Sequence, residues 1–261
     1  MKNTEIALKA LRGGGGNARS NAFTLAETLI TIGIIGILAA LTLPTIIVQK
    51  RNSELEARFK TAYSLISQAV FRMSADNANI AETYCSKGAD GRNSYEFIED
   101  FSKYFQTINL YASDTRNLTK IGYKEDFFKQ TNGYEKFNID GHNEGAFFIK
   151  NGMMIAASGC WWMANSIKPL DFIVDTNGIK GPNRLGYDVF YFQIINGNIL
   201  LPATHKYTFA AIESQLKVCC DFKNSGKNCH ASGDNGTACS HFALKNQYPQ
   251  DESKEYWKNL P

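Results

Sequence analysis

Oxygen-bearing side chains gather in one glycine-rich stretch in the second half of the chain. Carboxylate and amide oxygens are the ligands that Ca²⁺ prefers, and the ion takes roughly six to eight of them. The stretch is not an EF-hand, since the twelfth residue counted from Asp175 is Gly186 rather than Glu. Because Asp and Asn also form turns by bonding their own backbone, a structured loop without metal is the alternative. The candidate calcium ligands are Asp175, Asn177, Asn183 and Asp188.

The chain contains six cysteines, and four of them crowd into residues 219–239. In an oxidising compartment these are disulfide candidates, although the sequence cannot choose among the possible pairings. We expect at least one bridge inside the crowded group. Zinc binding with His230 and His241 is an alternative, but it is disfavoured because no C-x2-C pair is present. The disulfide candidates are Cys85, Cys160, Cys219, Cys220, Cys229 and Cys239.

Patterns typical of catalysis are absent from the sequence. The chain lacks the G-x-S-x-G, H-E-x-x-H, phosphate-binding-loop and dinucleotide-binding patterns. His142 and His205 belong to none of these patterns. The run Cys160-Trp161-Trp162 invites a redox or sugar-stacking function, but buried aromatic rings beside a disulfide are the simpler interpretation. We therefore predict that the protein is not an enzyme.

The element that precedes all of these groups is an apolar stretch near the N-terminus. It runs from Thr28 to Val48 without a charged side chain, and as a helix it reaches about 30 Å, the thickness of a bilayer's hydrocarbon core. Glu27 stands at its edge, where an unpaired carboxylate is costly and usually functional. Pro44 lies near its far end and favours a kink. Because the stretch is longer than a secretory signal core, we predict a membrane-spanning helix.

The segment before the apolar stretch is basic. Residues 1–22 hold four of the 28 basic side chains and one of the 25 acidic ones, which accounts for the whole formal charge of +3. The positive-inside tendency places this segment in the cytoplasm and the residues after Val48 on the oxidising side. The rest of the chain is formally neutral, so nothing in its bulk charge favours nucleic acid as a partner.

The junction Ala22-Phe23-Thr24-Leu25-Ala26-Glu27, with its basic leader and apolar helix, resembles the type IV pilin-like family of type IV pilins and type II secretion pseudopilins. The resemblance covers about residues 13–75, and the family usually has Gly where this chain has Ala22. It implies that a prepilin peptidase cleaves before Phe23, which is then N-methylated. It also implies that the subunit leaves the bacterial inner membrane through an assembly platform. In the filament, Glu27 would pair with the N-terminal amine of a neighbouring copy or related subunit.

Within this family the sequence leaves open a pilus subunit, a secretion pseudopilin and a DNA-uptake pilin. The major pseudopilins carry a Ca²⁺ site in their C-terminal region, so the resemblance favours a pseudopilin and a calcium loop at Asp175. The neutral mature charge disfavours a DNA-binding tip. The alternative from another class is a membrane-anchored periplasmic binding domain or enzyme. It would use the helix as a tether and the aromatic residues of 109–144 as its binding surface.

Hydrophobic periodicity predicts the helices that follow the apolar stretch. The first helix is expected to continue beyond the apolar stretch to about Asp76. A second amphipathic helix is expected from Ser94 to Ile108, and a short third one from Thr208 to Val218. Residues 109–144 and the tail after Val218 are expected to be loops. The apolar face of the continued first helix is formed by Leu55, Phe59, Ala62, Ile66, Ala69 and Met73.

Strand signals follow one another closely, joined by short turns such as Asn151-Gly152, and this favours an antiparallel meander. The expected strands are 146–150, 153–158, 170–174, 187–195 and 199–202. The fold class is therefore α+β. The resemblance implies a pilin-like arrangement, with the long membrane-spanning helix packed on the meander and a disulfide-bearing C-terminal region. The expected divisions are a leader (1–22), a transmembrane and assembly helix (23–48), its amphipathic continuation (49–79) and a periplasmic or extracellular globular domain (80–261).

Overall fold

The computed structural model divides the chain into two compact units, an N-terminal unit that ends at Ile47 and a C-terminal unit of Val48–Pro261. The predicted cleavage junction of Ala22 and Phe23 lies outside the described residues, as do His142, His205 and the Trp161-Trp162 pair. The structure describes residues 24–85, 94–111, 123, 128–129, 131, 136–137, 145–160, 169–202, 213–223, 229 and 235–261.

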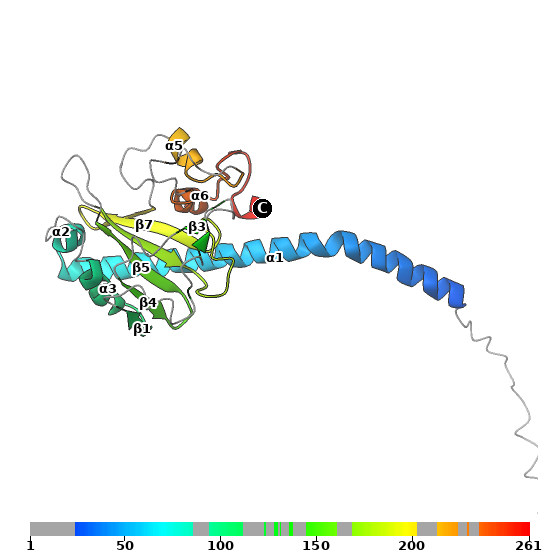
Figure 1. Cartoon of the computed structure of the whole chain (residues 1–261), viewed down its shortest axis with the longest axis horizontal. Helices are drawn as coiled ribbons and strands as arrows, with labels where there is room; N and C mark the ends of the chain where they lie inside the picture. Colours follow the sequence, from blue (N-terminus) through cyan, green and yellow to red (C-terminus); the bar gives the residue numbers. More distant parts are fainter. Residues whose placement is uncertain are drawn as a thin grey trace, which may run out of the picture. The chain divides into compact units, whose positions relative to one another are not determined.

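One long helix, α1 (Leu25–Asp76), begins in the N-terminal unit and ends in the C-terminal unit, where the sequence predicts its end (Figure 1). The helix includes Pro44 in its interior. After Asp76 the chain turns, and Asn77 donates from both its backbone and its side chain to the Met73 carbonyl. The predicted apolar face is confirmed, since the buried side chains of α1 are Asn52, Leu55, Phe59, Ala62, Ile66, Ala69, Val70 and Met73.

The C-terminal unit is built on a six-stranded antiparallel sheet with the order β1-β4-β5-β6-β7-β8. The last five strands are consecutive neighbours, so the predicted meander is confirmed. The tight turn between β4 and β5 contains Gly152 at φ 88°, a conformation that favours glycine. The meander consists of β4 (Ala146–Ile149), β5 (Met154–Cys160), β6 (Leu170–Asp175), β7 (Val189–Ile195) and β8 (Ile199–Pro202).

Alternate side chains of the sheet belong to two different cores, as the two-residue period of a strand requires. Phe172 and Phe190 join the larger core, which also contains the buried face of α1. Ile173 and Tyr191 join a smaller core on the other face. Phe59 of α1 lies against Phe190, with 4.5 Å between the ring centroids. The second half of α1 is therefore an integral part of the C-terminal unit.

The predicted helix from Ser94 to Ile108 is wrong in its second half. The helix α3 (Ser94–Ser102) ends early, and the next residues form the edge strand β1 (Thr107–Tyr111), which pairs with β4. Ile108 is 59% exposed instead of lying on a buried helical face. The exposed edge of β4 offers backbone partners that a continued helix could not use, and β-branched residues such as Thr107 and Ile108 suit a strand.

Regular structure also occurs where no helix or strand was predicted. The short helix α2 (Ile80–Cys85) follows α1. Residues 109–144, which were predicted to be loops, include part of β1 and the paired strands β2 (Phe128–Lys129) and β3 (Lys136–Phe137). The tail contains α6 (Cys239–Lys245) and a 3₁₀ helix, η1 (Trp257–Asn259). Of the predicted helix at 208–218, the described part is α5 (Glu213–Val218). These elements are too short to show a reliable period in the sequence.

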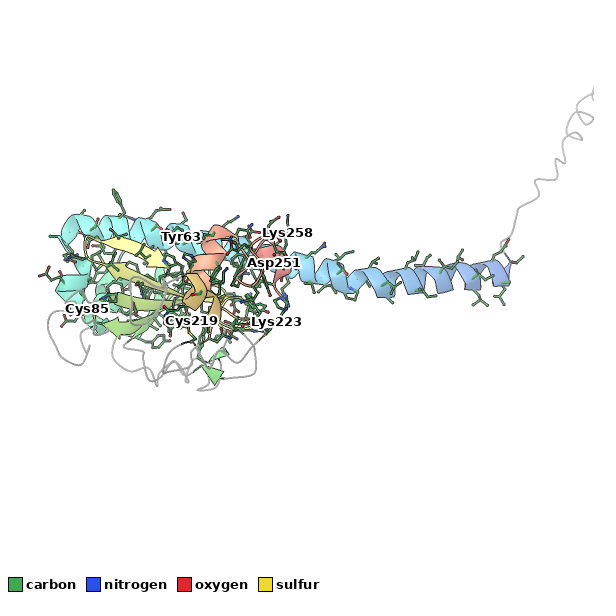
Figure 2. The ribbon with its side chains drawn as sticks, turned by 90° about the horizontal axis from the view of Figure 1, so that it is seen from above. Tyr63, Cys85, Cys219, Lys223, Asp251 and Lys258 are labelled. Atoms are coloured by element: carbon green, nitrogen blue, oxygen red, sulfur yellow. A yellow bond between two sulfur atoms is a disulfide. The ribbon has the colours of Figure 1, made fainter. Side chains whose placement is uncertain are left out.

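All six cysteines form disulfides. Two of the bridges lie inside the crowded group, as expected, and adjacent cysteines bond to different partners. The zinc alternative is wrong, because a zinc site needs thiolates and every sulfur is already bonded. In Figure 2 the labelled Cys85 and Cys219 belong to different parts of the C-terminal unit. The pairs are Cys85–Cys160, Cys219–Cys229 and Cys220–Cys239.

Candidate functional site

The first described turn of α1 holds Glu27 against Thr24. The backbone N–H and the hydroxyl of Thr24 both donate to Glu27 Oε2 at 2.9 Å, and the Glu27 N–H donates to Thr24 Oγ1 at 3.2 Å. This reciprocal pair is a capping box, which satisfies backbone donors at the start of a helix. The carboxylate also lies at the positive end of the helix dipole. Glu27 therefore helps to begin the helix as well as carrying a charge beside the apolar stretch.

The following part of α1 presents an apolar surface to its surroundings. Between Thr24 and Arg51 no side chain is buried, and Leu41 is 71% exposed. The helix is long and apolar enough to cross a membrane. A surface of this size and composition needs a bilayer or other apolar helices around it. The N-terminal unit is thus suited to membrane anchoring or to a signal function.

A second candidate site lies in the loop between β6 and β7, which begins at the buried carboxylate of Asp175. Its Oδ1 accepts from the N–H groups of Asn177 at 3.1 Å and Gly178 at 2.9 Å. Its Oδ2 accepts from the Tyr123 hydroxyl at 3.0 Å. Gly178 has φ 64°, and a Cβ there would collide with the Gly152 carbonyl oxygen. The turn therefore requires glycine at this position.

Asp188 closes the loop from its other end. Its two carboxylate oxygens accept from the N–H groups of Asn183 and Arg184, each at 2.8 Å. Burial raises the pKa of Asp188 to about 6, and burial together with the nearby Asp188 charge raises the pKa of Asp175 well above its ordinary value. No Lys or Arg of the described residues forms an ion pair with either carboxylate. Two buried carboxylates without a countercharge are costly to ionise together.

Several oxygens of the loop lack a hydrogen-bond donor. Thr176 Oγ1 and Asn177 Oδ1 are buried and have no partner in the described part of the chain. The Asn183 amide is satisfied in one orientation, in which its nitrogen donates to the Gly178 carbonyl at 3.0 Å and to Asp175 Oδ2 at 3.3 Å. In the same orientation its oxygen accepts from the Gly181 N–H at 3.2 Å. Thr176 Oγ1 and Asn177 Oδ1 are therefore the loop oxygens that a cation could still satisfy.

The residues of this loop therefore fit a hard cation such as Ca²⁺. Among the described residues, no three His, Cys, Asp or Glu side chains gather into a metal-binding group. A cation here would thus depend on Asp175 and Asp188 together with amide and carbonyl oxygens. The loop without metal remains an alternative, because both carboxylates already accept backbone N–H bonds.

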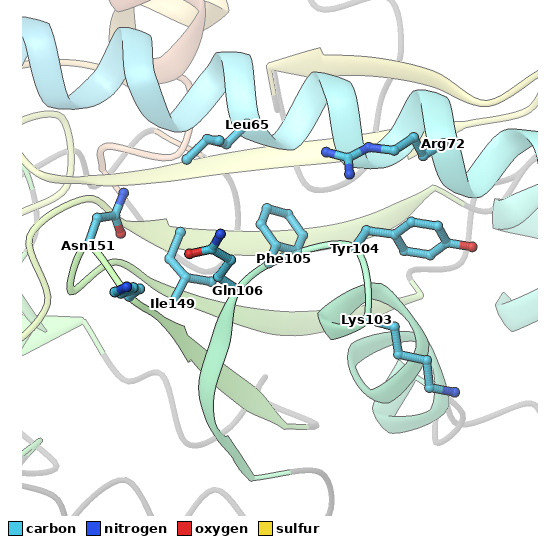
Figure 3. A pocket seen from close by; sticks show the side chains of 9 residues that line it. Leu65, Arg72, Lys103, Tyr104, Phe105, Gln106, Ile149 and Asn151 are labelled. Carbon is cyan, nitrogen blue, oxygen red and sulfur yellow. The ribbon is translucent and has the colours of Figure 1, made fainter.

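A groove of about 680 Å³ lies between α1 and the turns before β1 and after β4 (Figure 3). Its floor is apolar and its rim carries three cations, whereas none of its lining side chains is Asp, Glu, His, Cys, Ser or Thr. The groove therefore combines an apolar floor with a positively charged rim. Its lining residues are Leu65, Arg72, Lys103, Tyr104, Phe105, Gln106, Ile149, Lys150 and Asn151.

The four predicted calcium ligands come together in one loop, as their spacing suggests, while Glu27 lies in the other unit. Three further oxygens of the site were not predicted, those of the Tyr123 hydroxyl, the Thr176 hydroxyl and the Gly178 carbonyl. Thr176 and Gly178 lie within the predicted stretch, but no sequence signal connects Tyr123 to a loop some fifty residues later. No family model, curated protein sequence or solved structure matches this chain.

Proposed function

We propose that this chain is a structural subunit of a type IV pilus-like or type II secretion filament, made from the inner membrane and assembled through its first helix. The observation that supports this proposal most directly is the division of α1. Its first half exposes an apolar surface that is uncharged from Thr28 to Val48, and its second half buries one face in a disulfide-bonded α+β unit. An anchor alone needs only the first half. A subunit whose helix must leave the bilayer and carry its domain with it needs both.

In the proposed filament, the first halves of neighbouring helices surround one another and replace the lipid. Glu27 then sits in a dry, apolar bundle, where its carboxylate needs a positive partner. Cleavage before Phe23 supplies a free amine near the start of each helix. Pairing this amine with Glu27 of a neighbour favours one axial register, because every other register leaves two buried charges unpaired.

Mass analysis of the protein purified from its native membrane tests the processing step. We expect a mature chain that starts at N-methylated Phe23. This form is expected because a prepilin peptidase would remove residues 1–22 on the cytoplasmic side. A chain that retains residues 1–22, or one cut after Val48, would contradict the filament proposal. It would favour the alternative of a tethered or released domain.

We further propose that the loop between β6 and β7 binds Ca²⁺ and stabilises the C-terminal unit. The observation in favour is that Thr176 Oγ1 and Asn177 Oδ1 have no partner, and the two buried carboxylates of the loop no ion pair, within the described part of the chain. Asp175, Asn177, Asn183 and Asp188 would hold the ion, with the Gly178 carbonyl beside them. The bound ion would supply the positive charge that the carboxylates lack, and it would tie the two ends of the loop together.

Calcium binding predicts opposite pH dependences of stability with and without the metal. In chelator, the full-length protein in detergent should lose stability as the pH rises from about 4 to 6, since the raised pKa values mean that the folded state binds more protons than the unfolded state. The loss for Asp188 alone is about 3 kcal/mol, from a pKa of 3.8 that rises to about 6. With millimolar Ca²⁺, stability should instead fall as the pH drops below about 6, because protons displace the ion.

Thermal unfolding at pH 7, with and without Ca²⁺, measures the difference directly. The double substitution Asp175→Asn and Asp188→Asn should abolish the response to Ca²⁺. Lys180→Glu, an exposed change in the same loop, serves as the control for added surface charge and should keep the response. Equal melting temperatures in chelator and in calcium at pH 7 would show that the loop is structured without metal.

A further inference from the structure

Among the described residues, carboxylates are in excess at one end of the C-terminal unit. The described residues between 72 and 103 carry five carboxylates against two cations, Arg72 and Lys103. Lys103 pairs with Asp100 at 2.6 Å, whereas Glu82, Glu96 and Glu99 form no ion pair within the described part of the chain. We call this surface the acidic corner. It is formed by the end of α1, by α2 and by α3, and consists of Asp76, Glu82, Glu96, Glu99 and Asp100.

Among the described residues, positive charge is in excess at the opposite end. Five carboxylates there form ion pairs with lysine or arginine, and Asp221 is a further carboxylate. Lys50, Arg51 and Lys223 form no ion pair within the described part of the chain. Arg51 donates to the Asn52 amide oxygen and to the Pro261 carbonyl oxygen. We call Lys50, Arg51 and Lys223 the basic end. The neutral pairs around it are Glu54–Arg58, Glu56–Lys60, Glu252–Lys217, Asp251–Lys254 and Glu255–Lys258.

The two charged surfaces are far apart along the helix. Residues 51 and 76 of α1 are separated by 25 helical steps, or about 38 Å at the rise of an α-helix. In Figure 2 the labels of Cys85, in α2, and of Lys223 lie toward opposite ends of the C-terminal unit. A single copy therefore cannot bring these charges together, but two copies shifted along the helix axis can.

We propose that the acidic corner of one copy contacts the basic end of the next copy in the filament. This inference rests on the proposed function and names the partner as a second copy of this chain. Copies inserted in one membrane have parallel helices, so copies displaced along the axis meet through unlike ends. Such a head-to-tail contact does not close on itself and therefore builds an open filament. Complementary charge at the contact favours this arrangement over like-end contacts.

Charge reversal of each surface tests the contact in cells that express the full-length protein. The corner variant is Glu96→Lys with Glu99→Lys, and the end variant is Lys50→Glu with Lys223→Glu. Each variant alone should lower the sedimentable filament fraction at least tenfold, because it places like charges at the contact. The variant with all four changes restores opposite charges and should recover at least half of the wild-type fraction. Lys150→Glu, an exposed turn residue outside both surfaces, is the control and should assemble normally.

Co-expression adds a second, independent readout. Corner and end variants made in one cell should assemble together, since each presents the charge that the other lacks, and neither should assemble alone. Normal filaments from either single variant, or no recovery with the four changes, would overturn the contact. Absence of filaments from the wild-type protein would instead contradict the proposed function. Mature mass and intact disulfides in each variant show that processing and folding are unchanged.

Discussion

Replacement of Glu27 by alanine should abolish filament assembly while leaving cleavage of the leader intact. In the bundle of helices, the amine of each neighbour would lose its carboxylate partner. Breaking a buried charge pair in this way costs about 3–5 kcal/mol. A loss of about 1.4 kcal/mol is already enough to lower an equilibrium constant tenfold. We therefore expect the assembled fraction to fall at least tenfold. The measurement compares the filament fraction with the membrane fraction and determines the mass of the mature chain.

Two further variants separate the charge of Glu27 from its capping function. Glu27→Gln preserves an acceptor for the Thr24 N–H and hydroxyl, so the start of the helix should survive while assembly fails. Thr31→Ala removes a hydroxyl that bonds only to carbonyls of the same helix, and it should assemble normally. Normal filaments from Glu27→Ala would mean that the carboxylate has no pairing role.

Replacement of Phe59 by alanine should destabilise the C-terminal unit by about 4 kcal/mol. Phe59 is 1% exposed, and its ring lies 4.5 Å from Phe190 and 5.3 Å from Trp257, centroid to centroid. The substitution leaves a cavity between α1, the sheet and the tail that these large rings cannot fill. Chemical unfolding of the full-length protein in detergent measures the change.

The matched control is Phe71→Ala on the same helix. Phe71 is 78% exposed, so its loss should change the unfolding free energy by less than about 0.5 kcal/mol. A similarly small effect at Phe59 would contradict the packing of α1 against the sheet. It would also reduce the second half of α1 to a linker between the two units.

Local pattern was sufficient to predict the elements with a strong period. The apolar face of α1 repeats every three or four residues over several turns, so its buried side chains could be identified in advance. The strands of the meander were equally predictable, because short turns such as Asn151-Gly152 separate runs of apolar residues. The segment from Ser94 to Ile108 shows the limit of this reasoning. Its aromatic spacing fits a helix throughout, yet Thr107 and the residues after it form a strand that pairs with the free edge of β4.

Local sequence patterns were enough to predict the apolar stretch with Glu27 at its edge, the meander and the group of oxygen-bearing side chains between Asp175 and Asp188. These features depend on residues that are close together in the chain, where spacing alone specifies geometry. The folded structure was needed to identify the disulfide pairs, the hydrogen bond from the Tyr123 hydroxyl to Asp175 and the separation of the acidic corner from the basic end. Those features join residues that are distant in sequence, and their positions follow from how the sheet and α1 pack together.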